Sequence, residues 1–534
     1  MGTRDLLFVG LLVGGAAALG ASLYPTRVNR KVEVVDAGRA AEELAPVASR
    51  VDAAFRSRWA DENLRPAPPA DDRTVIRRLS LALVGSIPSL EEQRMLDSVP
   101  AESRVSLWTR LLLQDRRSAD YLAERLARAV VGTEGGPFLI FRRHRFVNWL
   151  SDQIHAGRPY DKIVRDLIAS DGIWTDKPAT NFITVTYDPD KKLVDAERLA
   201  GRVSRAFLVA RIDCAQCHDH PFADWKQADF QGLAAFFGKA ESGFTGIHEG
   251  GGEFRPTDRK TGKEHVVEPG VPFRRELLPK NGNRRERLAG WVVDRANPAL
   301  PRATVNRVWA LMFGRPLVEP VDDLPDEDAL PEALTTLADD FVAHGYDLHR
   351  LIRIIAATEV FRLDSAADPE PSLAAEKAWA VFPITPLRPE QVVGAVTQTA
   401  YLTTVDGESN ILVRLAKSLG EADFVKRYGD GGEAELDPHA GTIPQRLLLM
   451  NGEMVEKHVK PTLFNASMRV ATQAPDDRAA VEVAYLTVLT RKPTPDESAH
   501  FAKALAGTKG DARKDRVSDL FWSLINATEF SWNH

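Results

Sequence analysis

Apolar residues recur at the spacing of α-helices along most of this chain, and this pattern constrains the fold more than any other feature. Val75, Leu79 and Leu83 fall on one helical face, with Asp71 and Asp72 placed to cap its start. The same spacing predicts further helices over 102–114, 119–130, 142–156, 160–169, 287–295, 302–313, 330–344, 347–361, 389–401, 444–460, 478–490, 495–506 and 514–527. Strands do not alternate with these helices, so the sequence predicts a mainly α fold and argues against a doubly wound sheet.

A glycine- and proline-rich segment, residues 241–285, interrupts the helical pattern. Its only strand-like run is His265-Val266-Val267, so we expect a long loop or a small β-excursion. This segment would separate two helical domains, which we place at residues 45–240 and 286–534.

The N-terminus carries an uncharged apolar stretch from Leu6 to Tyr24. Nineteen residues of this kind suffice to span a bilayer, and they also resemble a signal peptide. We therefore assign residues 1–30 to a transmembrane or signal segment. A retained anchor is favoured because no clean cleavage site precedes Tyr24-Pro25. The protein is then expected in the cell envelope, held at the inner membrane by its N-terminus or secreted after cleavage.

The only two cysteines of the 534 residues stand in the motif Cys214-Ala215-Gln216-Cys217-His218. In a c-type haem site two cysteines in this spacing form thioethers, and the histidine that follows coordinates the iron. If the preceding helix continues through the motif, Cys214, Cys217 and His218 project from one face. Because c-type haem is attached on the outer face of the bacterial inner membrane, the export segment agrees with a periplasmic haem protein.

Two other interpretations of the motif remain open. Cys214, Cys217, His218 and His220 supply the four nitrogen and sulfur ligands of a closed zinc site, although their closeness in sequence makes a tetrahedron awkward. The two cysteines would also suit a disulfide or a redox pair in an oxidising compartment.

If haem is bound, its sixth ligand decides between electron transfer and ligand-binding chemistry. The candidates are Met312, Met450, His248 and His265. Both methionines lie in apolar helical runs that also suit a core, and both histidines suit an exposed loop. Separately, Arg302 and Arg307 are candidates to pair with haem propionates or to form ordinary ion pairs on a helix surface.

Charge and motif content limit the other functions. The net charge of −6 gives no reason to expect nucleic-acid binding. The chain has no Gly-x-Ser-x-Gly nucleophile motif, and its glycine run at 429–432 lacks the Lys-Ser/Thr of a phosphate loop. Whether the protein is an enzyme therefore stays open.

The context of the motif resembles a known family. The residues that carry the resemblance are Cys214 to Phe222, Trp225, Gln227 to Phe237, Asn297-Pro298, Arg302 to Trp309, Thr358 to Arg362 and Asn526 to His534. They are similar to planctomycete-type cytochrome-c-associated proteins, which carry two consecutive domains of unknown function, PSCyt-like and then PSD-like. The resemblance spans roughly residues 72–534. Leu126 to Gly132 replaces the Trp-Leu-Asp and Arg-Tyr residues usual in that family.

Together these observations predict an exported c-type haem protein that transfers electrons or gives redox support to a partner protein. The alternative is a binding or scaffold module without redox turnover, stabilised by zinc or a disulfide, in the handling of envelope or extracellular polymers.

Overall fold

The computed structural model describes residues 35–133, 143–188, 193–221, 223–257, 262–325, 327–406, 455, 458–460 and 465–534. The expected N-terminal segment and Met450 lie outside these residues. Within the described part, no helix has the length and apolar character needed to cross a bilayer.

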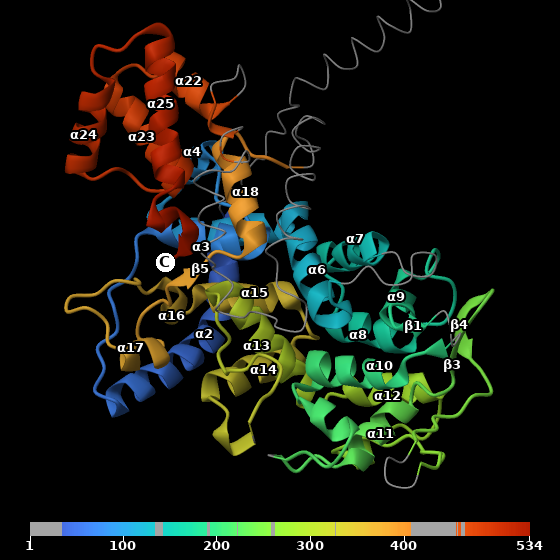
Figure 1. The fold of residues 1–534 in the computed structure, drawn as a ribbon. Helices are drawn as coiled ribbons and strands as arrows, with labels where there is room; N and C mark the ends of the chain where they lie inside the picture. The colour runs from blue at the N-terminus through green and yellow to red at the C-terminus, as the bar shows by residue number, and fades with distance from the viewer. Residues whose placement is uncertain are drawn as a thin grey trace, which may run out of the picture.

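Helices dominate the described chain, as predicted (Figure 1). The first half contains α2 (Val35–Asp61), α3 (Asp72–Val84), α4 (Leu90–Asp97), α5 (Ala101–Gln114), α6 (Arg116–Val131), α7 (Arg143–His155), α8 (Tyr160–Ala169), α9 (Asn181–Thr184), α10 (Ala196–Val203) and α11 (Gln227–Ala235). The second half contains α12 (Arg284–Val292), α13 (Ala299–Phe313), α14 (Glu332–Ala343), α15 (Leu348–Ala357), α16 (Glu359–Arg362), α17 (Leu373–Lys377), α18 (Pro389–Thr399), α22 (Ala466–Gln473), α23 (Asp477–Leu489), α24 (Pro495–Leu505) and α25 (Gly510–Ile525).

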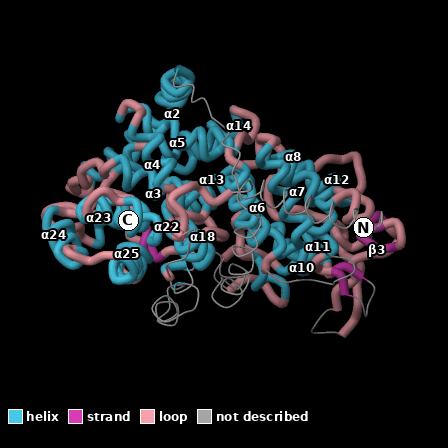
Figure 2. The backbone as a smooth tube through the Cα atoms, turned by 90° about the horizontal axis from the view of Figure 1, so that it is seen from above, coloured by secondary structure: helices cyan, strands magenta, loops and turns pink. Residues whose placement is uncertain are grey.

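The strands are short, and most of them lie at one end of the helical body (Figure 2). The antiparallel pairs of the described chain are β1 (Tyr187–Asp188) with β2 (Leu193–Val194), β3 (Ala240–Gly243) with β4 (Gly246–Glu249), and β5 (Thr385–Pro386) with β6 (Trp532–Asn533). The hairpin β3–β4 is the β-excursion expected at the start of 241–285. His265-Val266-Val267 does not form a strand.

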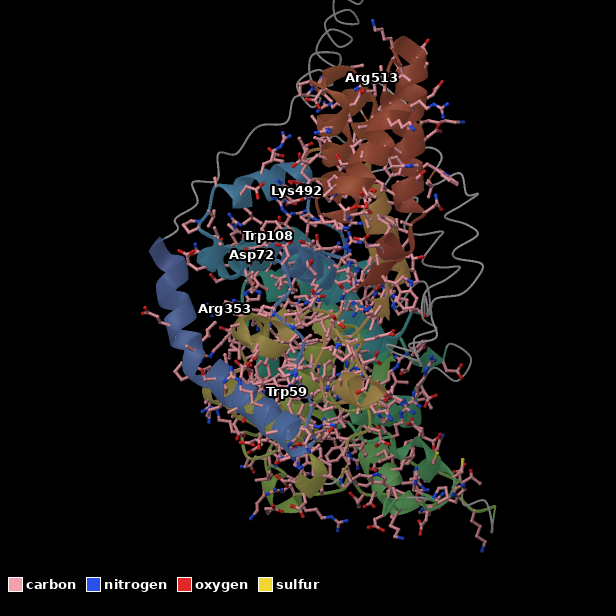
Figure 3. All side chains as sticks on the ribbon, turned by 90° about the vertical axis from the view of Figure 1, so that its left-hand side faces the viewer. Trp59, Asp72, Trp108, Arg353, Lys492 and Arg513 are labelled. Carbon is pink, nitrogen blue, oxygen red and sulfur yellow. The ribbon has the colours of Figure 1, made fainter. Side chains whose placement is uncertain are left out.

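Helix α13 lies at the centre of the fold. Every residue of α13 except Arg302 is buried, so the helix must be enclosed by other elements on nearly every side. Trp309 stacks on Phe313 at 4.3 Å between ring centroids, and on Phe55 of α2 at 5.7 Å. Trp379 meets both rings of α13 edge-on. The long α2 packs along one side of the molecule, where the Trp59 indole donates to the Ala378 carbonyl at 2.9 Å (Figure 3).

The hydrophobic core does not divide at residues 241–285. One continuous cluster of buried side chains runs from Leu44 to Phe382, and so includes both expected domains. A second cluster joins α18 with α22–α25 and also takes in Leu81 and Ile87 from the first half. The two expected domains are therefore separate in sequence but share their core.

Asp52 is a buried carboxylate within this core. Its Oδ1 accepts a hydrogen bond of 2.8 Å from the Glu359 backbone N–H at the start of α16. Burial raises the pKa of Asp52 to about 6, against the opposing effect of that hydrogen bond. Because the native pKa lies above the ordinary one, protonation favours the folded state. The destabilisation that comes from burying the ionised Asp52 carboxylate is thus complete above about pH 6. It disappears as the pH falls toward about 4, where the group is protonated.

We therefore expect Asp52→Asn to stabilise the protein at pH 8 by up to about 3 kcal/mol. The gain should shrink as pH is lowered through 6 toward 4, where wild-type Asp52 is itself protonated. Urea unfolding at pH 4 to 8 measures this. Asp61→Asn, at an exposed position of the same helix, is the control and should change little at any pH. A variant less stable than wild type at pH 8 would show that the carboxylate's hydrogen bond outweighs its burial.

Candidate functional site

The helix that leads to the cysteine motif ends before it, so the condition for Cys214, Cys217 and His218 to share one α-helical face is not met. After α10 the chain forms a π-helical turn, Ser204–Leu208, and Val209 then takes a left-handed conformation with φ of 46°. This conformation is strained for a β-branched residue, and it breaks the α-helical hydrogen bonding. The motif lies instead in a short 3₁₀ helix, η3 (Ile212–Gln216), with Cys217 at its end and His218 outside it.

This short helix has one buried face and one open face. Ile212 and Ala215 point into the core, at 1% and 0% exposure. Cys214 is exposed and Cys217 half-buried, and both are free thiols. The two apolar residues thus anchor η3, and the two sulfur atoms remain accessible from solvent.

His218 is exposed and its ring is oriented by the chain itself. Its Nδ1 lies 2.7 Å from the backbone carbonyl oxygen of Asp219. A carbonyl oxygen only accepts, so Nδ1 is the donor in this contact, and in the neutral imidazole Nε2 then keeps its lone pair. The imidazole therefore presents Nε2 as a potential metal ligand.

The turn that follows is held by hydrogen bonds to the start of α11. The Gln227 backbone N–H donates to Asp219 Oδ1 at 3.0 Å. This bond, with the nearby Lys226 ammonium, lowers the pKa of Asp219. The side chain of Gln227 donates in turn to the Gln216 carbonyl at 3.2 Å. Asp219 thus fixes the turn.

Residues of the second half form hydrogen bonds with the chain segment that precedes the motif. The guanidinium of Arg307, on α13, donates to the Ala206 carbonyl at 3.0 Å. The Leu324 N–H donates to the Val209 carbonyl at 2.9 Å. Arg211 reaches the same loop, where its Nε donates to Asp322 Oδ1 at 2.8 Å. We call Arg307 and the loop 321–325 the clamp, because they hold both sides of the strained Val209.

The structure brings together only part of the predicted ligand set. Among the described residues, no three histidine, cysteine or acidic side chains form a group that could hold a metal ion. Met312 is 1% exposed and lies in the core cluster. His248 is half-buried on β4, where Nδ1 lies 3.1 Å from the Gly246 carbonyl oxygen, and His265 is exposed. The role of each of these residues as the sixth ligand of a haem iron stays a prediction.

The two arginines expected near haem propionates have other partners. Arg307 is 3% exposed and faces the backbone carbonyls before the motif. Arg302 pairs with Glu327 at 2.5 Å, the ion-pair alternative considered for it. Sequence reasoning missed the clamp altogether. The acidic pair Asp322-Asp323 is visible in the sequence, but nothing in the sequence pairs it with Arg211, which lies 111 positions earlier.

These features describe a mainly helical protein with two accessible thiols and an oriented histidine on its surface. Residues 50–242 match the family model PSCyt2, protein of unknown function (DUF1549), and residues 284–418 match PSD1, protein of unknown function (DUF1553). The chain therefore carries these two domains in succession, in the predicted order. The gap between the two matches falls in the glycine- and proline-rich segment. No curated protein and no solved structure matches the chain.

Removing one contact of the clamp should make local opening of the motif easier and leave the stability of the core unchanged. In Asp322→Ala, the Arg211 guanidinium loses its carboxylate acceptor. We expect the free energy of local opening to fall by about 1 kcal/mol. Amide hydrogen exchange over 209–217 should then accelerate roughly fivefold, with exchange in α13 unchanged. Asp328→Ala, an exposed position close by in the chain, is the control and should leave 209–217 unaffected. Unchanged exchange over 209–217 in Asp322→Ala would show that the Arg211–Asp322 pair does not hold the motif.

Proposed function

We propose that Cys214, Cys217 and His218 hold one covalently attached haem c, and that the protein transfers electrons or gives redox support to a partner protein in the cell envelope. The observation that carries the proposal is the orientation of His218. Its Nδ1 is committed to the Asp219 carbonyl at 2.7 Å, which leaves Nε2 free for iron. This is the arrangement a histidine needs in order to serve as an axial ligand.

The thiols support the same proposal. Both are reduced, and Cys214 is open to solvent, as the attachment chemistry requires. Each thiol adds across a vinyl group: a carbon–sulfur bond forms, and the thiol hydrogen passes to the neighbouring vinyl carbon. The addition needs no oxidant or reductant. Once bound, the haem supplies a one-electron iron couple.

The protein's own residues would fix the site before haem arrives. The clamp holds the chain before the motif, and Asp219 and Gln227 hold the turn after it. Trp225, which packs against Phe273 with ring centroids 6.4 Å apart, lies beside the turn and accepts the His220 N–H at its carbonyl. Held at both ends, the motif keeps its two thiols and its imidazole in a fixed relation, which lowers the entropic cost of attachment.

Exposure of the motif suits electron transfer. Cys214 and His218 both face solvent, so a partner protein could approach this surface. We further propose that residues 1–30 place the protein at the periplasmic side of the inner membrane, as an anchor or as a signal that is removed. The resemblance to cytochrome-c-associated proteins points to the same setting.

The test is purification from a strain that matures c-type cytochromes, followed by denaturing electrophoresis with a haem stain. We expect a coloured band that persists after denaturation and disappears in Cys214→Ser/Cys217→Ser. His155→Ala, which removes an exposed histidine of α7, is the control and should keep full colour.

A colourless wild-type band would contradict the proposal. Stoichiometric zinc in that sample would favour the closed metal site with His220, and a Cys214–Cys217 disulfide would favour the scaffold alternative.

A further inference from the structure

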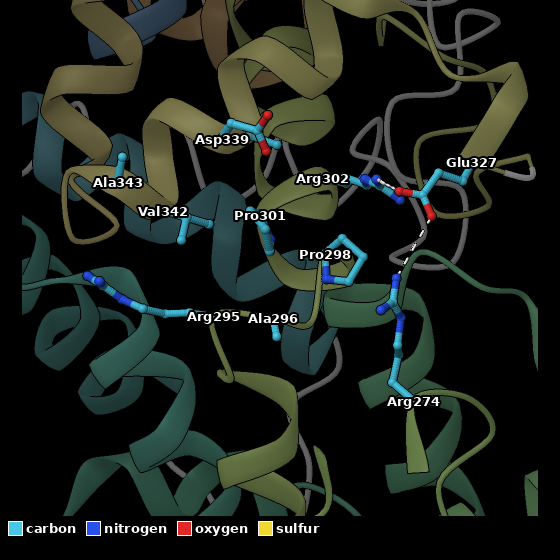
Figure 4. Close-up of a pocket in the computed structure, with 11 residues that line it drawn as sticks. Arg274, Arg295, Ala296, Pro298, Pro301, Arg302, Glu327, Asp339, Val342 and Ala343 are labelled. Carbon is cyan, nitrogen blue, oxygen red and sulfur yellow. Dashed lines mark hydrogen bonds and ion pairs between the residues drawn. The ribbon is translucent and has the colours of Figure 1, made fainter. Parts of the chain in front are cut away.

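A cavity of about 340 Å³ lies between the start of α13 and the C-terminal end of α14 (Figure 4). Its floor is apolar and includes Pro298, Pro301 and Val342. Its size is that of a site for a compact organic molecule. The Cys214–His218 segment does not line it, so the inference below is independent of haem attachment.

Two arginines and a carboxylate meet at one end of the cavity. Arg302 Nη2 lies 2.5 Å from Glu327 Oε1, and Arg274 Nη2 lies 4.0 Å from Glu327 Oε2. Figure 4 shows both guanidinium groups turned toward this one carboxylate. Guanidinium forks suit carboxylate, phosphate and sulfate groups, so Glu327 shows what kind of group this end of the cavity holds.

Glu327 is a replaceable partner. It belongs to a one-turn 3₁₀ helix, Glu327–Ala329, and its side chain is 59% exposed, whereas Arg302 is only 16% exposed. The hydrogen bond from Arg302 lowers the pKa of Glu327, so the carboxylate is ionised at neutral pH. A carboxylate so exposed can turn into solvent at small cost, because solvent-exposed ion pairs contribute little to stability.

Arg274 is held in place at a cost in backbone strain. Its φ of 46° lies in the left-handed region, which a non-glycine residue rarely adopts. The buried indole of Trp291 donates to the Arg274 carbonyl at 3.2 Å and fixes this conformation. Strain of this kind persists where the surroundings impose it and is frequent at ligand-binding positions.

The charge of the lining also favours an anion. Three arginines face two acids, Glu327 and Asp339, so the lining carries 3 − 2 = +1, and +2 once Glu327 turns away. Arg295 lies at the opposite end of the cavity (Figure 4), and within the described chain it has no ion-pair partner. The net positive charge of the lining therefore favours an anion over a cation.

We propose that this cavity binds a compact organic oxyanion, whose acidic group replaces Glu327 between Arg274 and Arg302. The body of the ligand lies on the proline and valine floor. Glu327 is thus an internal competitor that occupies the arginines until the ligand displaces it. The chemistry shared by the candidate ligands is one carboxylate, phosphate ester or sulfate ester on a sugar-sized body.

Calorimetric titration of the full chain at low ionic strength tests the proposal. The probes are glucuronate, glucose 6-phosphate, glucose 6-sulfate, inorganic phosphate and neutral glucose, and their ranking separates the three acidic groups. We expect at least one sugar anion to bind, and glucose not to bind.

Two variants should change the affinity for the anion in opposite directions, which a purely structural role of these residues would not produce. Glu327→Gln removes the competitor and should tighten binding up to about fivefold, whereas Arg302→Gln removes a direct contact to the anion and should weaken binding at least tenfold. Glu332→Gln, an exposed glutamate at the start of α14, is the matched control and should bind as wild type does.

Three results would overturn the proposal. They are no anion binding to Glu327→Gln, a change of the same sign in Glu327→Gln and Arg302→Gln, and binding of inorganic phosphate as tightly as any sugar anion. Glu327→Gln alone carries the test if Arg302→Gln does not fold.

Discussion

The enclosure of α13 is the constraint on which the rest of the structure depends. A helix buried on every side but one must be surrounded, and the chain surrounds it from both halves, with Phe55 on one side and Trp379 on another. The apolar area that α13 removes from water makes it a dominant source of stability. Buried side chains of the first half belong to the same cluster as α13.

From α13, two arginines extend to the two sites. Arg307 is buried and holds the carbonyls that precede the cysteine motif, whereas Arg302 is the residue of α13 that escapes full burial and lines the cavity. The loop after α13 also contributes to both, since Asp322 binds Arg211 near the motif and Glu327 binds Arg302. The two sites are thus built on one rigid helix and one connecting loop.

The sequence predicts the helices well and the site less well. Helical spacing located α5, α6, α7, α8 and most later helices to within a few residues. It did so because a helix that buries one face carries apolar residues at the period of that face. It failed at Val209, where the helix ends through a π-helical turn that leaves no signal in apolar spacing. The clamp was invisible for another reason: Arg307 and Ala206 are about 100 positions apart, and no local pattern pairs them. A motif is readable from neighbours in sequence, but what holds it in place is tertiary.

We infer that the two halves form one folding unit, in which the second half holds the cysteine motif of the first. Residues 35–240 and 241–534, produced as separate chains and then mixed, test it most directly by hydrogen exchange over 209–217. We predict no protection there in the first fragment alone, and protection restored when the second fragment is added. Full protection in the isolated first fragment would contradict the claim, because the motif would then need neither α13 nor the clamp.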